Sequence, residues 1–326
     1  MPRLIYLDIK QVRKGMELLR IHKALADETR LRLAAVLCSF ELNVGELVGV
    51  FGMGQPRISR HLKILAEAGL LECRREGLWA FYRAAQSGPG LAFLQRHGEL
   101  LQAIGPHAQD RERALCAVRE RAHATRRFFD AVAGQWRDLS REVLGDFDLA
   151  EELSSRMRPG MIAADLGCGP GELLARLAAS ARQAIGVDGS ARMLELAGAR
   201  LAGSGNVSLR LGELEHLPLR EAEVQAATLS MVLHHVNDPH AVLAEARRVL
   251  APGGTLFVAE FDRHDNEAMR VKYGDTRLGV DKETLYDWLQ TAGFTPRRVD
   301  AFPVNQGLVV LIAEAALSEP SGPTTL

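Results

Sequence analysis

Hydrophobic positions in the first third of the chain recur at intervals of three and four residues, the period of an amphipathic helix. This period predicts helices over residues 9–26, 28–40, 44–51 and 55–68. Ile58, Leu62 and Leu65 fall on one face of the fourth helix. Two short segments, 70–74 and 79–83, then predict a hairpin around Arg75-Glu76-Gly77. Two further helical segments, 91–107 and 110–144, follow the hairpin.

From residue 162 onward the pattern changes, because short apolar runs alternate with helical segments. Strands are expected near 162–166, 183–188, 207–211, 224–230, 254–260, 296–302 and 308–313. Helices are expected between them, including 172–179, 190–201, 239–249 and 282–292. This alternation is typical of a doubly wound α/β sheet, in which ligands bind beyond the carboxyl ends of the strands.

The chain is long enough, at 326 residues, for two domains. The patterns predict a mainly helical domain over 1–108, a helical connector over 109–155 that includes the helices expected to cover a ligand, an α/β domain over 156–316 and a disordered tail over 317–326. We find no apolar run of roughly 18 residues and no signal-peptide layout, so we expect a cytoplasmic protein without a membrane partner. The four cysteines are scattered without CxxC spacing, which suggests neither a disulfide framework nor a zinc knuckle.

Charge is unevenly distributed along the chain, although the net charge is only −1. Residues 1–90 contain 14 Lys and Arg against 9 Asp and Glu, whereas the remainder contains 26 against 32. A basic N-terminal third is suited to a phosphate-rich partner, although many basic segments are only solvated surface.

The solvent face of the fourth helix and the hairpin after it carry side chains able to contact DNA bases or phosphates. These candidate DNA-binding residues are Gln55, Arg57, Ser59, Arg60, His61, Lys63, Arg74 and Arg75. The run Leu25-Ala26-Asp27-Glu28-Thr29-Arg30-Leu31-Arg32, the run from Ser59 to Leu70 and the hairpin resemble the ArsR-type regulators. The resemblance implies a mainly α winged helix-turn-helix domain, a homodimer, and an inverted repeat in double-stranded operator DNA as partner. A winged helix used only for protein contacts is the alternative.

Many ArsR-type regulators sense metals through two cysteines in a segment that here reads Glu41-Leu42-Asn43-Val44-Gly45-Glu46-Leu47. Asn43 and Gly45 occupy the two cysteine positions. His97, His107 and His123 lack the paired carboxylate–histidine spacing of the second family site. We therefore expect no metal site and look elsewhere for the effector.

The segment Asp165-Leu166-Gly167-Cys168-Gly169-Pro170-Gly171 joins a predicted strand to a predicted helix. Alternate glycines let the backbone turn tightly and approach a ligand. Asp188, at the end of the next strand, lies where nucleotide ribose hydroxyls are bound. A dinucleotide-binding fingerprint would place its third glycine at position 172, which is Glu172.

This glycine segment resembles motif I of class I S-adenosylmethionine-dependent methyltransferases. Residues 187–190, 212–218, 232–236 and 250–254 resemble the later motifs of that family in the correct order, and 128–133 with Trp136 resembles the helix that covers its cofactor. Gln225 departs from the family, which often has Asp there. The resemblance implies an α/β Rossmann-like domain and S-adenosyl-L-methionine or S-adenosyl-L-homocysteine as ligand. The implied cofactor-binding residues are Asp165, Gly167, Gly169, Gly171, Asp188, Gly189, Ser190, Gly212, Glu213, Ser230 and His234.

Two functions remain open from the sequence. In the first, the chain is a dimeric transcriptional regulator that binds the adenosyl ligand as an effector and controls methionine or methyl-cycle genes. Residues 262–279 resemble a subgroup in which an ArsR-type DNA-binding domain is fused to a methyltransferase-type domain. In the second, it is an active methyltransferase of a small molecule that also regulates its own operon. Its catalytic base would be His235, chosen over His234, Glu260, Asp262 and His264, and the methyl acceptor is unknown.

Overall fold

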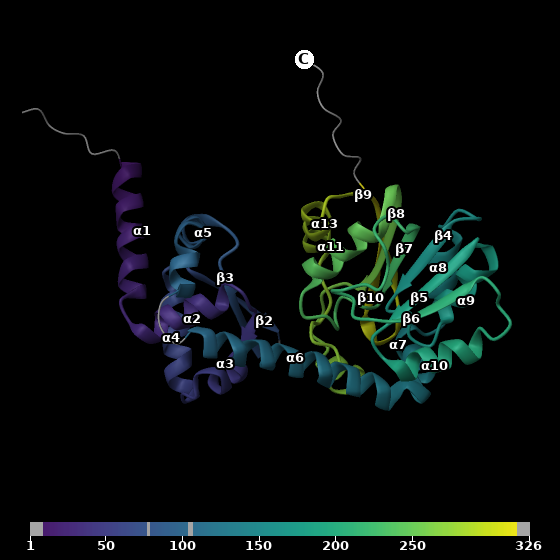
Figure 1. Ribbon diagram of the computed structural model, residues 1–326, viewed down its shortest axis with the longest axis horizontal. Coiled ribbons are helices and arrows are strands. Elements are labelled where there is room, and N and C mark those ends of the chain that lie inside the picture. The colour runs from purple at the N-terminus through teal and green to yellow at the C-terminus, as the bar shows by residue number, and fades with distance from the viewer. Residues whose placement is uncertain (1–8, 77–78, 104–106, 318–326) are drawn as a thin grey trace, which may run out of the picture. The chain divides into compact units, whose positions relative to one another are not determined.

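The computed structural model describes residues 9–76, 79–103 and 107–317 (Figure 1). The chain divides into two compact units, Met1–Arg121 and Ala122–Leu326. The finer four-part division made from the sequence stays a prediction, and its tail lies almost entirely outside the described residues. In the described part of the chain, none of the helices combines the length and the apolarity needed to cross a membrane.

Unit 1 is a helical domain with a small antiparallel sheet. Its helices are α1 (Ile9–Leu25), α2 (Glu28–Leu37), α3 (Val44–Phe51), α4 (Gln55–Glu67) and α5 (Gly88–Ala103). The strands β1 (Leu42–Asn43), β2 (Leu71–Glu76) and β3 (Trp79–Ala84) pair in the order β1-β3-β2. Leu33, Leu47, Ile58, Leu62 and Leu65 are fully buried where the helices meet. The predicted apolar face of α4 is therefore confirmed, while the tip of the β2–β3 hairpin lies outside the described residues.

Asn43, which occupies one of the missing cysteine positions, begins helix α3. Its side chain accepts a hydrogen bond from the backbone N–H of Glu46 at 2.9 Å, and the Glu46 carboxylate accepts one from the backbone N–H of Asn43 at 2.8 Å. This reciprocal capping box satisfies two N–H groups that the helix itself leaves without partners. Asn43 therefore has a structural role in the place of a metal ligand.

The connector is not one continuous helix. Helix α6 (His107–Val132) is followed by a short 3₁₀ turn, η1 (Ala133–Gln135), and by α7 (Trp136–Leu144). The break includes Gly134, which has low helix propensity. The prediction of a single helix over 110–144 was therefore wrong at this turn.

Unit 2 is a seven-stranded sheet in the order β6-β5-β4-β7-β8-β10-β9. Its strands are β4 (Ile162–Leu166), β5 (Gln183–Asp188), β6 (Val207–Leu211), β7 (Val224–Ser230), β8 (Leu250–Phe261), β9 (Phe294–Pro303) and β10 (Val309–Leu317). The first five are parallel, whereas β10 runs antiparallel to both β8 and β9. The strand order reverses beside β4, which is the point where open α/β sheets bind ligands.

Helices cover both faces of this sheet, and each face has its own hydrophobic core (Figure 1). On one face pack α8 (Leu149–Ser155), α9 (Glu172–Ser180), α10 (Ala191–Arg200) and α12 (Ala268–Tyr273). On the other pack α11 (Pro239–Val249) and α13 (Lys282–Thr291). A second 3₁₀ turn, η2 (Asn305–Gly307), precedes β10. The predicted α/β sheet is confirmed, and α8 and α12 are additions to it.

Candidate functional site

A cavity of about 680 Å³ opens in unit 2 beyond the carboxyl ends of the parallel strands. The loops after β4, β5, β6 and β7 form one side of it, and residues of α6 and α7 contribute the other. Nine of the eleven cofactor-binding residues expected from the sequence line this cavity: Asp165, Gly167, Gly169, Asp188, Gly189, Ser190, Gly212, Glu213 and Ser230. Gly171 and His234 are not among the lining residues, whereas His235 is.

The three glycines after β4 have different structural roles. Gly167 has a φ of 83°, and a Cβ there would lie 2.6 Å from Val232. At Gly169 a Cβ would meet nothing within 4 Å, so the backbone faces open space in the cavity. Gly171 begins α9 with a φ of 79° and packs against Ala197. A glycine is required at position 171 for the backbone conformation and for packing against α10. This role explains why Gly171 does not line the cavity.

Asp188 connects the first two loops of the site. Its carboxylate accepts hydrogen bonds from the backbone N–H groups of Gly169 and Ser190, both at 2.8 Å. Burial raises the pKa of Asp188, and the two N–H donors oppose this rise. Each carboxylate oxygen retains a lone pair for a further donor. The acid is thus oriented by the backbone and still lines the cavity.

Asp165, near the end of β4, is buried, with only 2% of its surface exposed. Burial raises its pKa to about 7, although the hydroxyl of Thr228 donates a hydrogen bond to its Oδ1 atom at 2.7 Å. Thr228 was not among the residues singled out from the sequence. A threonine in a buried strand is ordinarily a packing residue, so no local signal distinguished it.

Helix α6 contributes two polar contacts to the site. Arg126 forms an ion pair with Glu213, and Asp130 accepts a hydrogen bond from the Ser190 hydroxyl at 2.6 Å. Ser190 also caps α10 by accepting from the backbone N–H of Met193 at 3.0 Å. The sequence analysis expected the segment from residue 128 to cover the cofactor but predicted neither contact.

The tandem histidines after β7 occupy different surroundings. His235 donates from Nδ1 to the Gly274 carbonyl at 3.2 Å and packs edge-on against Phe129. Burial, together with the neighbouring His234, lowers the pKa of His235 well below its ordinary value. His235 is therefore a neutral imidazole, and its Nε2 atom carries the lone pair.

His234 lies deeper and is bound to Glu260. Its Nδ1 atom is 2.5 Å from Glu260 Oε1, and its backbone N–H donates to Glu260 Oε2 at 3.0 Å. Burial lowers the pKa of His234, but Glu260 and Asp275 outweigh burial and raise it to about 9. Of the other candidate bases, Glu260, Asp262 and His264 are not among the residues that line the cavity.

In unit 1, the proposed DNA-binding side chains divide into two groups. Gln55, Arg57, Arg60, Lys63 and Arg75 are exposed, and Ser59 is half-buried. By contrast, His61 is directed inward, with Nδ1 3.8 Å from Asp27, and burial lowers its pKa.

Arg74 binds the Glu41 carboxylate through two nitrogens, at 3.1 and 2.9 Å, and lies over the ring of Phe81. The placement of His61 and Arg74 assigns them structural contacts within the unit. It does not support the DNA contacts expected for them from the sequence.

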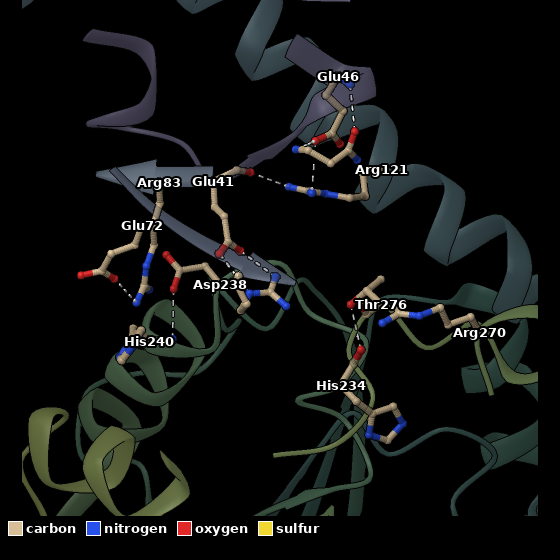
Figure 2. Close-up of polar contacts among 12 residues, drawn as sticks. Glu41, Glu46, Glu72, Arg83, Arg121, His234, Asp238, His240, Arg270 and Thr276 are labelled. Carbon is tan, nitrogen blue, oxygen red and sulfur yellow. Dashed lines mark hydrogen bonds and ion pairs between the residues drawn. The ribbon is translucent and has the colours of Figure 1, made fainter. Parts of the chain in front are cut away.

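The N-terminal part of α6 is bound tightly to the rest of unit 1. Arg32 makes two hydrogen bonds to the buried Asp110, at 2.7 and 2.8 Å. Figure 2 shows Arg121 between the Glu46 carboxylate, at 3.3 Å, and the Glu41 carbonyl oxygen, at 3.1 Å. Arg113 donates to the Val50 carbonyl at the end of α3. Through these contacts α6 is joined to α2 and α3.

The sheet order, the glycine loop and the acid after β5 define a class I methyltransferase-type fold. Comparison with known families and relatives gives the same assignment. The family described as "Methyltransferase domain" matches residues 164–258, and "Bacterial regulatory protein, arsR family" matches residues 27–72. A ubiquinone/menaquinone biosynthesis C-methyltransferase of Acidiphilium cryptum is 30% identical over 210 residues, which cover 54% of this chain and 84% of that protein. The chain therefore belongs to the class I methyltransferase family and carries an ArsR-family helix-turn-helix ahead of that domain.

Two further comparisons show how much of a relative the chain matches and which solved structure shares its fold. A 37.1 kDa protein in transposon TN4556 of Streptomyces fradiae is 41% identical over 124 residues, 37% of this chain, but the match spans only 35% of that relative. The crystal structure of Burkholderia thailandensis 1,6-didemethyltoxoflavin-N1-methyltransferase, with bound 1,6-didemethyltoxoflavin and S-adenosylhomocysteine, superposes with a TM-score of 0.50. It is 22% identical and covers 62% of this chain and 91% of that one. At this identity the likeness concerns the fold alone.

Proposed function

We propose that this protein is a DNA-binding transcriptional regulator whose methyltransferase domain binds S-adenosylmethionine or S-adenosylhomocysteine as an effector. The observation that carries the proposal is helix α6. Its first half holds α2 and α3 of the DNA-binding unit, and its second half lines the cavity of the methyltransferase unit. Arg121, which contacts Glu46, and Arg126, which contacts Glu213, are five residues apart on this one helix.

The residues of the cavity fit an adenosyl ligand. The loop at Gly167 and Gly169 offers backbone without side chains, and the oriented Asp188 carboxylate is the acceptor that two ribose hydroxyls require. Asp188 would hold the ribose, Glu213 the adenine amino group and the glycine loop the methionine portion. When bound, S-adenosylmethionine supplies an activated methyl group.

Glu213 is the residue through which a bound ligand would affect helix α6. It is the expected partner of the adenine amino group and also the ion-pair partner of Arg126 on α6. A ligand that engages Glu213 therefore changes the contacts of α6. A ligand can shift DNA affinity only by the difference in its own affinity for two arrangements of the protein, and this competition is a source of such a difference.

The test measures the coupling directly. DNA fragments enriched from a random pool by the purified full-length protein serve as probe, and DNA affinity is measured by fluorescence anisotropy with and without saturating S-adenosylhomocysteine or S-adenosylmethionine. We expect a change of about 5- to 150-fold, the usual range of allosteric coupling. The reciprocal change in ligand affinity, measured by calorimetry with and without DNA, must equal it. Ligand binding with no effect on DNA affinity refutes the effector role.

A second function, methyl transfer, is favoured by the placement of His235. Its neutral imidazole lines the cavity, and Nε2 is available to accept a proton from a methyl acceptor. Because relatives are named as quinone methyltransferases, the reduced (hydroquinone) form of a demethylated quinone is the first acceptor to test, since its hydroxyl proton can pass to His235 while its ring carbon takes the methyl group. We expect S-adenosylhomocysteine to form in its presence at a rate that falls about 100-fold or more in His235→Ala. Equal rates in both proteins refute His235 as the base.

A further inference from the structure

Buried polar side chains from three segments of unit 2 converge beside the cavity. His234 and His235 follow β7, Glu260 lies in β8, and Asp275 follows α12. His234, Glu260 and Asp275 are 3%, 1% and 4% exposed. Groups this deeply enclosed ordinarily have partners, because an unpaired buried charge is costly.

The segment that carries Asp275 is held against the His234 backbone. Thr276 donates to the His234 carbonyl oxygen from both its backbone N–H, at 2.9 Å, and its hydroxyl, at 2.8 Å. The backbone N–H of Arg277 donates to the same oxygen at 3.0 Å. Figure 2 shows the Thr276 hydroxyl directed at this carbonyl. Asp275 is therefore fixed in position next to the two histidines.

The Asp275 carboxylate lacks the hydrogen bonds that its burial would require. Neither of its oxygens has a hydrogen-bond partner among the described residues. Its Oδ1 atom lies 3.8 Å from His234 Nε2 and 4.0 Å from His235 Nδ1. One donor atom from each of these three residues lies within 4.8 Å of the other two.

Glu260 orients His234 in the way that carboxylates orient metal-binding histidines. The contact of Glu260 with Nδ1 places a proton on that nitrogen, and Nε2 faces Asp275 at 3.8 Å, where a metal ion would take the place of the second ring proton. A histidine ligand typically donates its other ring N–H to a carboxylate in this manner.

We propose that His234 Nε2, His235 Nδ1 and an oxygen of Asp275 bind a divalent transition-metal ion of the zinc class. Two imidazoles and one carboxylate suit Zn²⁺, and three protein ligands leave a coordination position open. Asp275 Oδ1 would approach each of the two nitrogens by about half an ångström, given metal–ligand distances of roughly 2.0–2.2 Å. His235 Nδ1 would exchange its hydrogen bond to the Gly274 carbonyl for the metal. This inference departs from the sequence analysis, which expected no metal.

The competing interpretation is a metal-free ion cluster in which a protonated His234 lies between Glu260 and Asp275. The two interpretations differ in one measurable property. Untagged full-length protein is dialysed against a chelator and titrated with Zn²⁺ alone by calorimetry, and with Co²⁺ by visible absorption. We expect one saturable ion per chain, with Co²⁺ absorption bands of a site that contains nitrogen ligands.

Variants locate the ion. His234→Gln and Asp275→Asn should each abolish the one-equivalent binding, because each removes a ligand. Glu260→Gln should weaken binding about 10- to 100-fold without abolishing it, since it orients a ligand. Asp265→Asn, an exposed carboxylate in the same segment, is the matched control and should bind like the unmodified protein.

The proposal is overturned if the unmodified protein shows no saturable Zn²⁺ binding, or if Asp275→Asn binds as tightly as the unmodified protein. Because a variant could fail to fold, the melting temperature of the unmodified protein is also measured with chelator and with Zn²⁺. A native-state site must raise it with increasing Zn²⁺, and an unchanged melting temperature contradicts the site. These measurements need neither DNA nor an adenosyl ligand, so their failure leaves the proposed regulatory function intact.

Discussion

The Asp188 carboxylate at the end of β5 accepts a hydrogen bond from the backbone N–H of Gly169 in the loop after β4, at 2.8 Å. One side chain thus fixes the loop that would contact a ligand and also offers the remaining acceptors. The conformation of the glycine loop and the chemistry of the proposed ribose site therefore depend on the same residue.

We expect Asp188→Asn to lower the affinity for S-adenosylhomocysteine about 100-fold or more. The amide loses the charge and one acceptor oxygen, and each hydrogen bond to a charged group contributes about 1.5–3 kcal/mol. Calorimetric titration of the variant measures the loss. Glu195→Gln, an exposed carboxylate on α10, is the control and should bind normally. An unchanged dissociation constant for Asp188→Asn would remove this residue from the site.

Asp165 should make the stability of the protein depend on pH in a defined direction. Its pKa is about 7 in the folded state and about 3.9 in an unfolded chain, so the folded state binds the proton more strongly. Stability is therefore highest when Asp165 is protonated and falls as pH rises from about 4 to 7. Between pH 5 and pH 8 this group should cost about 3 kcal/mol.

Asp165→Asn removes the titration while leaving an oxygen to accept from Thr228. Urea unfolding at pH 5 and pH 8 should show that the unmodified protein loses about 3 kcal/mol more than the variant. The difference between the two proteins cancels the other titrating groups. Parallel losses in both proteins would mean that Asp165 ionises normally.

Removing Arg126 should uncouple the ligand from DNA. In Arg126→Ala the helix α6 no longer has the ion pair with Glu213, so ligand binding there changes no contact of the helix. DNA affinity without ligand should stay within about twofold, while the ligand-induced change should largely disappear. Arg119→Ala, at an exposed arginine elsewhere on α6, is the control and should retain the full change, as anisotropy titrations will show.

Arg57 and Arg60 should carry DNA affinity, because both are exposed on α4. Each alanine substitution is expected to weaken DNA binding about tenfold and to reduce the slope of log affinity against log salt by about 1 if the residue contacts a phosphate. Binding of S-adenosylhomocysteine should be unchanged. His61→Gln is the informative comparison, since its inward placement predicts a loss of stability with little effect on DNA affinity.

The fold could be predicted largely because burial imposes regular periods on the sequence. The bounds of β4, β5, β6, β7 and α11 agree with the strands and helix expected from the apolar pattern. The short helices α8 and α12, of 7 and 6 residues, were not predicted, because so few residues scarcely complete two turns and establish no period.

The candidate site could be predicted only where a local motif marks it. The glycine loop and Asp188 are adjacent to strand ends and were singled out from the sequence, and Gly167, Gly169 and Asp188 line the cavity. The contacts of Ser190 with Asp130 and of Thr228 with Asp165 join residues 60 and 63 positions apart, and no local pattern connects such pairs. The inward rotation of His61 was missed for a similar reason, since helical period alone does not decide how a residue at the boundary of the apolar face is directed.

Helix α6 also limits how this chain can change in length. An α-helix turns by about 100° for every residue, so the angle about the helix axis between the Arg121 and Arg126 side chains is set by the number of residues between them. A single inserted residue would rotate one group of contacts by more than a quarter turn relative to the other, whereas seven inserted residues would nearly restore the angle. This stretch therefore accepts new residues only in nearly whole helical turns.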